Sequence, residues 1–403
     1  MRQIFKITIL SIFFLTVYFF LFWSGAIKYL ALGSSYYFGD YQIFINALNC
    51  YNQGLSPYNG PKELNCSGFN YGHVVLFFTI FRDFITGPNY MLIPFTLIFL
   101  FTTLTVNLIN PKNIFQFFIC ALALLNPATL LLIERMNLDI LLYLILIFIS
   151  FNRIYFINWL LVIYSFLLKF FPFIFGMIIF VEKNNRKILS IFGIFLFIFF
   201  SSLIFIFFFK DEYSLMLEDS KSWKMGLHYL FSIKSIPKVF KEAFTINYGF
   251  SLLFFYILFI YFIYKNCKSN HQELENKYNF EKKLFLLSSN SLIFFYLVSS
   301  NAFYKEVFLI LTIPHLLNNF SIKEFRYILN ILCIKFLFNF IYTLDLNFET
   351  FYHLENVRIY KTHFLIIVFL KGLIDYLLIM YLGTITMKLN VNLFRSLKKK
   401  LMK

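Results

Sequence analysis

The residues best suited to chemistry in this 403-residue chain are one aspartate and three cations near the ends of hydrophobic stretches. Asp40 follows the first stretch, and Arg135, Lys169 and Lys305 lie near the ends of later ones. A carboxylate can act as a general base on an attacking hydroxyl. Cations at low dielectric bind phosphate oxygens strongly. Together these groups predict a site for a phosphate or diphosphate at a membrane surface, although each cation alone is explained equally well by snorkelling to the interface.

The sequence around Asp40 predicts the helix that would hold it. Gly39-Asp40 is typical of a helix start, with the Asp40 side chain as the N-cap acceptor. Gly54 suits the C-terminal end, and Ser56-Pro57 prevents continuation. Polar and apolar residues separate at helical spacing, which predicts a helix in the membrane interface. The polar face comprises Gln42, Asn46, Asn49 and Gln53, and the apolar face Phe44, Ala47, Leu48 and Tyr51. The alternative interpretation of Asp40 is a solvated helix cap with no chemistry.

Composition indicates an all-α polytopic membrane protein. Apolar residues make up 60% of the chain and the mean hydropathy is +0.73. Long apolar runs of this kind exclude a soluble core. We expect about twelve transmembrane helices, and Val74 to Ile85 as a second interfacial helix in the first outer loop. The expected spans lie near 7–32, 90–109, 114–133, 138–150, 153–168, 170–181, 188–209, 247–264, 283–299, 306–320, 327–344 and 363–387.

The distribution of Lys and Arg orients these spans. The net charge is +16, and the basic loops and the basic tail fall on one side, which is cytoplasmic by the positive-inside rule. Both termini are therefore expected in the cytoplasm. We predict a single integral-membrane domain over 1–403, with outer loops at 33–89 and 210–246 and a basic cytoplasmic tail at 388–403. Charge dispersed over short loops argues against nucleic-acid binding. The abundance of Phe, Ile, Asn and Lys is typical of an AT-rich genome and favours a bacterial inner membrane.

Short motifs between residues 36 and 305 surround the candidate residues. They are Gly39-Asp40-Tyr41-Gln42-Ile43-Phe44 with Gly54-Leu55-Ser56-Pro57-Tyr58, Asn126-Pro127 with Glu134-Arg135-Met136-Asn137-Leu138-Asp139, Leu168-Lys169-Phe170-Phe171-Pro172, and Asn301-Ala302-Phe303-Tyr304-Lys305. This set resembles the GT-C class glycosyltransferases, particularly the polyprenol-phosphate-mannose-dependent α-mannosyltransferases. Many relatives in that group have a Gly-Gln-x-Asn turn where this chain has Glu134-Arg135-Met136-Asn137, so only the Asn is shared.

The resemblance implies a GT-C-like fold and a membrane glycosyltransferase. Such an enzyme would move a hexose such as mannose from a polyprenyl-phosphate donor to a glycan or glycolipid acceptor at the outer face, with inversion at the sugar carbon. Asp40 would be the catalytic base. The donor phosphate would be bound by Arg135, Lys169 and Lys305, and orienting roles would fall to Glu134, Asn137, Asp139 and Tyr304. A purely local ion pair is the alternative interpretation of Glu134 and Arg135.

Other functions remain open at this point. No His pair has metal-ligand spacing, so a metal site has little support, although a divalent cation could bridge Asp40 and the donor phosphate. A multi-span transporter or lipid flippase would suit the intramembrane ions Lys335, Lys371 and Asp375. A polymerase or ligase acting on lipid-linked glycans would share the membrane and the donor. Polar residues concentrate after the first span and in outer turns rather than at mid-membrane, which favours the interfacial enzyme.

The first outer loop also contains two cysteines. Cys50 and Cys66 are the only cysteines expected on the outer side, and the glycines and prolines between them allow a tight return. A disulfide is one prediction. Two unpaired thiols are the alternative, because five cysteines show no framework.

Overall fold

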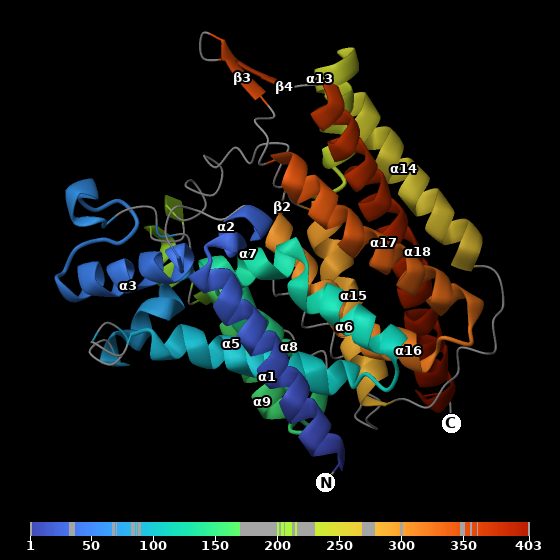
Figure 1. The fold of residues 1–403 in the computed structure, drawn as a ribbon, viewed down its shortest axis with the longest axis horizontal. Helices are drawn as coiled ribbons and strands as arrows, with labels where there is room; N and C mark the ends of the chain where they lie inside the picture. The colour runs from blue at the N-terminus through green and yellow to red at the C-terminus, as the bar shows by residue number, and fades with distance from the viewer. Residues whose placement is uncertain are drawn as a thin grey trace. The chain divides into compact units, whose positions relative to one another are not determined.

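The computed structural model of the chain is mostly helical (Figure 1). It describes residues 2–31, 37–66, 69, 71–81, 85, 87, 90–169, 200, 203–204, 206–211, 214–215, 230–267, 279–298, 301–346, 351–354, 357–360 and 362–401. The chain divides into two compact units, which are described separately. Unit 1 comprises Met1–Ser35, Thr102–Leu132 and Met225–Lys403, and unit 2 comprises Tyr36–Phe101 and Ile133–Lys224.

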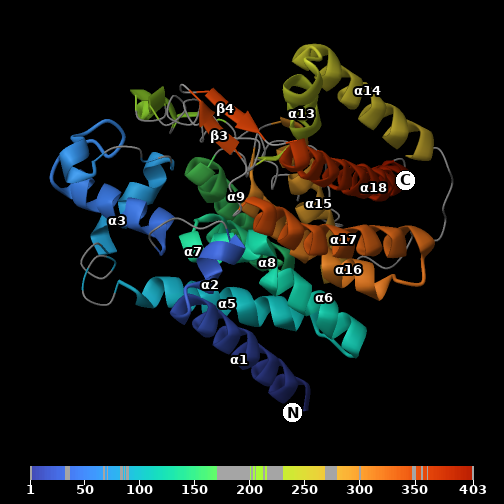
Figure 2. The ribbon, with the colours of Figure 1, turned by 45° about the horizontal axis from the view of Figure 1, so that its top comes forward.

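Unit 2 begins with helix α3 (Gly39–Asn52) and the loop that returns from it (Figure 2). The loop carries the short 3₁₀ helices η1 (Lys62–Leu64) and η2 (His73–Phe81). Helix α8 (Asp139–Phe151) leads into α9 (Tyr155–Lys169), and η2 packs against both α3 and α9. The second helix expected in the first outer loop, from Val74 to Ile85, corresponds to the 3₁₀ helix η2, and residues 82–84 lie outside the described residues.

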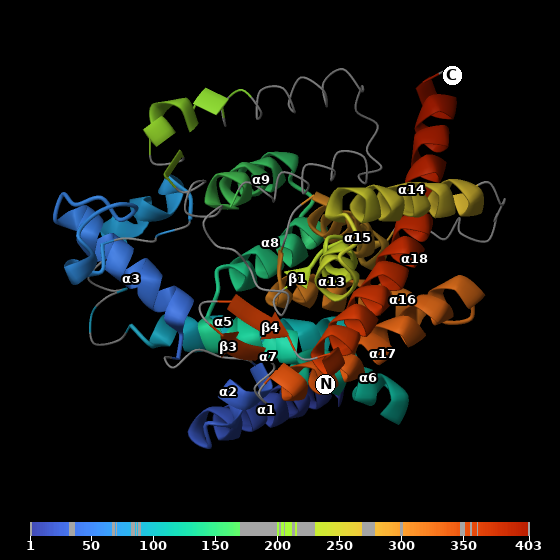
Figure 3. The same cartoon turned by 90° about the horizontal axis from the view of Figure 1, so that it is seen from above.

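In unit 1, four helices pack against the long C-terminal helix α18 (Thr362–Leu401), as Figures 1 and 3 show. They are α13 (Ser235–Phe244), α14 (Tyr248–Cys267), α15 (Phe280–Val298) and α17 (Lys323–Leu346). Gly383 permits the close approach of α14, because a Cβ atom there would lie 2.9 Å from Cδ1 of Ile263. The expected basic tail at 388–403 continues α18 as far as Leu401.

Unit 1 also contains helices and strands outside this group. They are α1 (Arg2–Trp23), α2 (Ala26–Ala31), α6 (Ile114–Leu125), the 3₁₀ helix η6 (Phe303–Thr312), α16 (Ile313–Asn318), and two antiparallel strand pairs, β1 (Leu230–Phe231) with β2 (Asn301–Ala302) and β3 (Phe351–Leu354) with β4 (Val357–Tyr360). The expected outer loop at 210–246 thus contains β1 and α13. Helices α5 (Leu92–Ile109) and α7 (Pro127–Arg135) pass from one unit to the other.

The described residues contain five helices that are long and apolar enough to cross a membrane, namely α1, α5, α14, α17 and α18. A sixth would be α6 with α7, which bend by 44° at Asn126. These helices agree with an all-α membrane protein, but the twelve expected spans are not confirmed. The expected spans at 170–181 and in most of 188–209 lie outside the described residues.

Several expected spans take a different form in the structure. The span expected at 306–320 is wrong as a single α-helix, because it consists of η6 followed by the six residues of α16. The span expected at 7–32 breaks at Ser24-Gly25, where Gly25 has a φ of 71°. Helices α8 and α9 have 13 and 15 residues, or roughly 20 to 22 Å at the α-helical rise. That length falls short of the ~30 Å of bilayer hydrocarbon.

Candidate active site

Asp40 does not cap its helix, so this prediction is wrong. The N-cap of α3 is Phe38 in a left-handed conformation with a φ of 56°, and no side chain accepts from the free N–H groups there. Asp40 lies inside the first turn and is buried, with a side chain only 9% exposed. Its negative charge is favoured by the N-terminal end of the helix dipole. The carboxylate is instead directed at the turn between α7 and α8.

Both oxygens of Asp40 are held by that turn. Nε of Arg135 donates to Oδ1 at 3.0 Å, and Nη2 donates to the same oxygen. Nδ2 of Asn137 donates to Oδ2. These partners are 95 and 97 residues away in the sequence. Arg135 thus forms an ion pair with a residue far away in the sequence. The alternative interpretation, a purely local pair with Glu134, does not account for this contact.

A strained turn places Arg135 and Asn137. Helix α7 ends at Arg135, and the buried Met136 takes a φ of 50°, a conformation uncommon for residues other than glycine. The Oδ1 atom of Asn137 then accepts from the backbone N–H of Asp139 at 3.0 Å, at the start of α8. Left-handed residues of this kind cluster at sites where the surroundings hold the backbone in place. The strain at Met136 fits a turn that must direct two neighbouring side chains at Asp40.

Lys169 joins the group from the end of α9. Its ammonium donates to Oδ1 of Asn137 at 2.8 Å and to Oδ1 of Asp139 at 3.1 Å, and it lies 4.8 Å from the ring centre of Tyr71. Asp139 is fully buried, and the Lys169 side chain is 11% exposed. Lys169 therefore orients the Asn137 amide, whose Nδ2 group then points at Asp40. The orienting roles expected for Asn137 and Asp139 and the phosphate role expected for Lys169 stay predictions.

Backbone contacts connect the parts of this site. The N–H of Phe38 donates to the carbonyl of Glu134 at 2.7 Å, and the N–H of Gly72 donates to the carbonyl of Leu168 at 2.9 Å. The Glu134 side chain is fully buried. Tyr41, next to Asp40, donates to the carbonyl of Tyr90 at 3.2 Å, and burial, helped by Tyr90, raises the pKa of Tyr41 to about 12. Tyr41 therefore keeps its proton at neutral pH.

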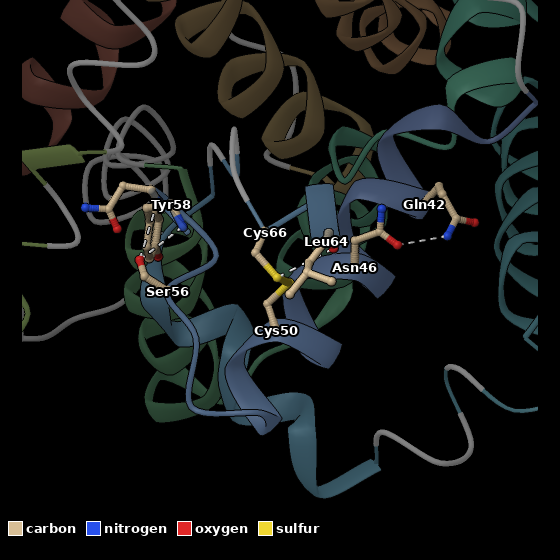
Figure 4. The surroundings of a disulfide bond; sticks show 8 residues. Gln42, Asn46, Cys50, Ser56, Tyr58, Leu64 and Cys66 are labelled. Carbon is tan, nitrogen blue, oxygen red and sulfur yellow. Dashed lines mark hydrogen bonds between the residues drawn. A yellow bond between two sulfur atoms is a disulfide. The ribbon is translucent and has the colours of Figure 1, made fainter. Parts of the chain in front are cut away.

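The loop after α3 is closed by the expected disulfide. Figure 4 shows Cys50 of α3 bonded to Cys66, with Cα atoms 5.6 Å apart. Gly54, with a φ of 73°, ends α3 in a Schellman motif. The N–H of Gly54 donates to the carbonyl of Tyr51, and the N–H of Leu55 donates to the carbonyl of Cys50. Gly60 is required by packing, because a Cβ atom there would lie 2.7 Å from the Cys66 carbonyl oxygen. The expected faces of α3 are largely present, except that Tyr51 is exposed.

Tyr304 and Lys305 belong to unit 1 and are described with it. They begin η6, directly after the short pairing of β1 with β2. Lys305 is 5% exposed, and its ammonium lies 5.6 Å from the ring centre of Phe295 and 5.8 Å from that of Tyr304. The Asp40, Arg135, Asn137, Asp139 and Lys169 group belongs to unit 2. The phosphate role of Lys305 and the orienting role of Tyr304 stay predictions.

Unit 1 contains a second, fully buried group of charges. Lys335 of α17 and Lys371 of α18 both donate to Oε1 of Glu306, at 2.7 and 3.0 Å. Both also pair with Asp375 of α18. Asn339 donates to Oε2 of Glu306 at 2.8 Å. Two acids and two bases thus neutralise one another inside the helix packing. Glu306 itself is 1% exposed.

The described residues contain no group of three or more His, Cys, Asp or Glu side chains that could hold a metal ion. Comparison of the chain with protein-family models, curated proteins and solved structures finds no match.

Proposed function

We propose that this chain is a membrane glycosyltransferase that moves a hexose, such as mannose, from a polyprenyl-phosphate donor to a glycan or glycolipid acceptor. The supporting observation is the buried carboxylate of Asp40, oriented through both oxygens by Arg135 and Asn137 beside a second cation, Lys169. A general base and phosphate-binding cations are the groups that transfer from a phosphate leaving group requires. The proposed fold is GT-C-like with about twelve spans.

In the proposed reaction the acceptor oxygen attacks the anomeric carbon and the bond from that carbon to the phosphate oxygen breaks. Asp40 takes the acceptor proton, and the bonding electron pair leaves with the polyprenyl phosphate. The donor phosphate competes with Asp40 for Arg135, whose side chain is 25% exposed. This exchange would free Oδ1 of Asp40 for the proton while Asn137 still holds Oδ2. Attack opposite the phosphate inverts the sugar carbon.

The proposed location is the outer face of a bacterial inner membrane, with both termini in the cytoplasm. The disulfide between Cys50 and Cys66 supports this, because disulfides persist in oxidising compartments such as the periplasm. Cys50 and Asp40 lie on the same helix, so the disulfide and the proposed base share one side of the membrane. The lipid tail of the donor would stay in the bilayer.

The test is a donor-cleavage assay with purified protein in liposomes that contain a synthetic polyprenyl-phosphate-mannose and a bacterial lipid extract as the acceptor source. We expect the protein to release polyprenyl phosphate and to form a mannosylated product. Asp40→Asn should abolish most of this release. Asp211→Asn is the matched control, because Asp211 is an exposed aspartate of the same unit. Equal release by both variants, or none by the wild type with any polyprenyl-phosphate hexose, would refute the proposal.

The buried charges of unit 1 favour a transporter as the second candidate. Ionisable groups inside spans often mark an ion or substrate path. Here, however, Lys335, Lys371, Glu306 and Asp375 pair with one another. A transporter would move the labelled donor across the liposome bilayer without cleaving it, which the same preparation can measure.

A further inference from the structure

Helix α13 in unit 1 has two different faces. The helix packs against α18 (Figure 3). Ile236 and Val239 are buried on one side. The contact is close, because a Cβ atom on Gly372 of α18 would lie 2.9 Å from Cγ1 of Ile236. The opposite side carries lysines at helical spacing. An amphipathic helix with a basic polar face is typical of a helix on a membrane surface.

We define the lysine stripe as Lys234, Lys238 and Lys241. These positions are four and three residues apart and therefore share one face of α13. None of the three takes part in an ion pair with any residue that the structure describes. Burial and then Lys234 lower the pKa of Lys238 below its usual value, which Glu242 partly offsets. Neighbouring lysines that repel one another favour a bound anion.

The short connection from α13 to the apolar helix α14 puts this stripe next to the start of a candidate span. Helix α14 begins at Tyr248, three residues after Thr245, the C-cap of α13, and is apolar enough to span. Only 17% of its apolar window is buried inside the protein, so most of it is exposed apolar surface that suits contact with lipid. Phe244, Ile246 and Phe250 are exposed around the connection. Apolar side chains here and lysines on α13 match the acyl and headgroup layers of a membrane.

We propose that the lysine stripe is a binding surface for the headgroups of anionic phospholipids in the leaflet where α14 begins. The charges are complementary, and the helix is fixed at headgroup depth by its connection to a span. Each lysine near an anionic surface strengthens binding about fivefold, so three would contribute roughly a hundredfold. This attraction should weaken with salt, because the Debye length falls from about 10 Å at 0.1 M to about 3 Å at 1 M.

The experiment uses the full chain in liposomes with trace photoactivatable phosphatidylglycerol or, in a parallel sample, photoactivatable phosphatidylcholine. Cross-linked peptides are identified by mass spectrometry. We expect phosphatidylglycerol to label the 234–250 segment at least tenfold more than phosphatidylcholine, with the preference lost at 1 M salt. The triple variant Lys234→Gln, Lys238→Gln, Lys241→Gln should lose this labelling, and the triple arginine variant should keep it.

Labelling elsewhere on this basic protein serves as the internal reference, and the melting temperature of each variant reports folding. If the glutamine variant is unfolded, the salt dependence and the arginine variant still decide the question. Equal labelling of 234–250 by the two lipids would overturn the proposal. It would also fail if the labelling were displaced by an equimolar polyprenyl phosphate but not by unlabelled phosphatidylglycerol, since the stripe would then be a donor site.

Discussion

Replacing Glu306 with Gln should strongly destabilise unit 1. Gln keeps the size of the side chain but removes the charge that Lys335 and Lys371 share at 2.7 and 3.0 Å. Each such pair has a gross attraction of about 6 kcal/mol at an effective dielectric of 20. Desolvation offsets part of this, and breaking a buried pair typically costs about 3 to 5 kcal/mol. Two buried lysines would be left to share Asp375 alone.

The assay is reversible unfolding of the purified protein in mixed micelles, followed by circular dichroism. Adding Lys335→Gln to the Glu306→Gln variant restores neutrality, because Lys371 and Asp375 remain paired at 2.9 Å. We therefore expect the loss of unfolding free energy in the double variant to be smaller than the sum of the losses in the two single variants, by about 2 kcal/mol or more. Glu242→Gln, at an exposed glutamate of unit 1, should change stability by less than about 0.5 kcal/mol. Additive effects of the two single changes would refute the charge-balance reasoning.

Three further predictions concern other parts of the chain. Lys169→Met should lower the free energy of unfolding by about 3 kcal/mol, because the buried Asp139 loses its ion pair with Lys169. Adding Asp139→Leu should restore much of this stability but should not restore sugar transfer. Restored transfer would exclude a phosphate role for Lys169. Burial, more than a nearby lysine, lowers the pKa of His315 to about 3, so the unfolded state takes up a proton first as the pH falls below about 6.5. The wild type should therefore lose about 2 kcal/mol more than His315→Gln between pH 7 and pH 5, and equal losses would contradict the assignment. Replacing both Cys50 and Cys66 by Ser should lower the free energy of unfolding by about 3 kcal/mol, because the unfolded chain regains the entropy that the closed loop removes. Equal stability of the wild type under reducing and oxidising conditions would argue against the disulfide.

Local patterns in the sequence were sufficient for the elements of the first loop. The spacing of polar and apolar residues predicted α3 and most of its buried face, and Gly54 predicted its end. The disulfide was one of two alternatives that the position of the cysteines around a tight return left open, and the structure contains it. These features depend on residues close together in the chain, which is why they could be read from it.

The hydrogen-bond partners of Asp40 depend on residues far apart in the chain. An Asp after a Gly suits a helix cap by local propensity, but the left-handed Phe38 moves the helix start and directs the carboxylate to Arg135 instead. The signs of a site were present as charges near span ends, yet their pairing needs the tertiary fold. Only the spacing of Lys371 and Asp375, four residues apart, hinted at the charge network, and nothing local indicated Glu306.

Hydropathy was least informative about the form of the helices. An apolar run such as 306–320 satisfies the pattern of a span, but the chain folds it as η6 and α16. The charged Lys305 and Glu306 open this run, and they are buried beside Phe295 and Lys335 respectively. Apolar length alone therefore does not give the helical form of this segment.

The most direct test of the proposed base is a single-turnover measurement at saturating polyprenyl-phosphate-mannose, which separates the chemical step from donor binding. The Asp40→Asn side chain can still accept from Arg135 and keeps its size, but it cannot take a proton. We expect the rate of sugar transfer at saturating donor to fall by at least ~10²-fold, the loss typical of removing a general base. Donor affinity should not fall, because Arg135 no longer pairs with a carboxylate, and the melting temperature reports the cost of losing this buried pair separately. A transfer rate within a few-fold of the wild type would contradict the account and leave Asp40 as a structural partner of Arg135.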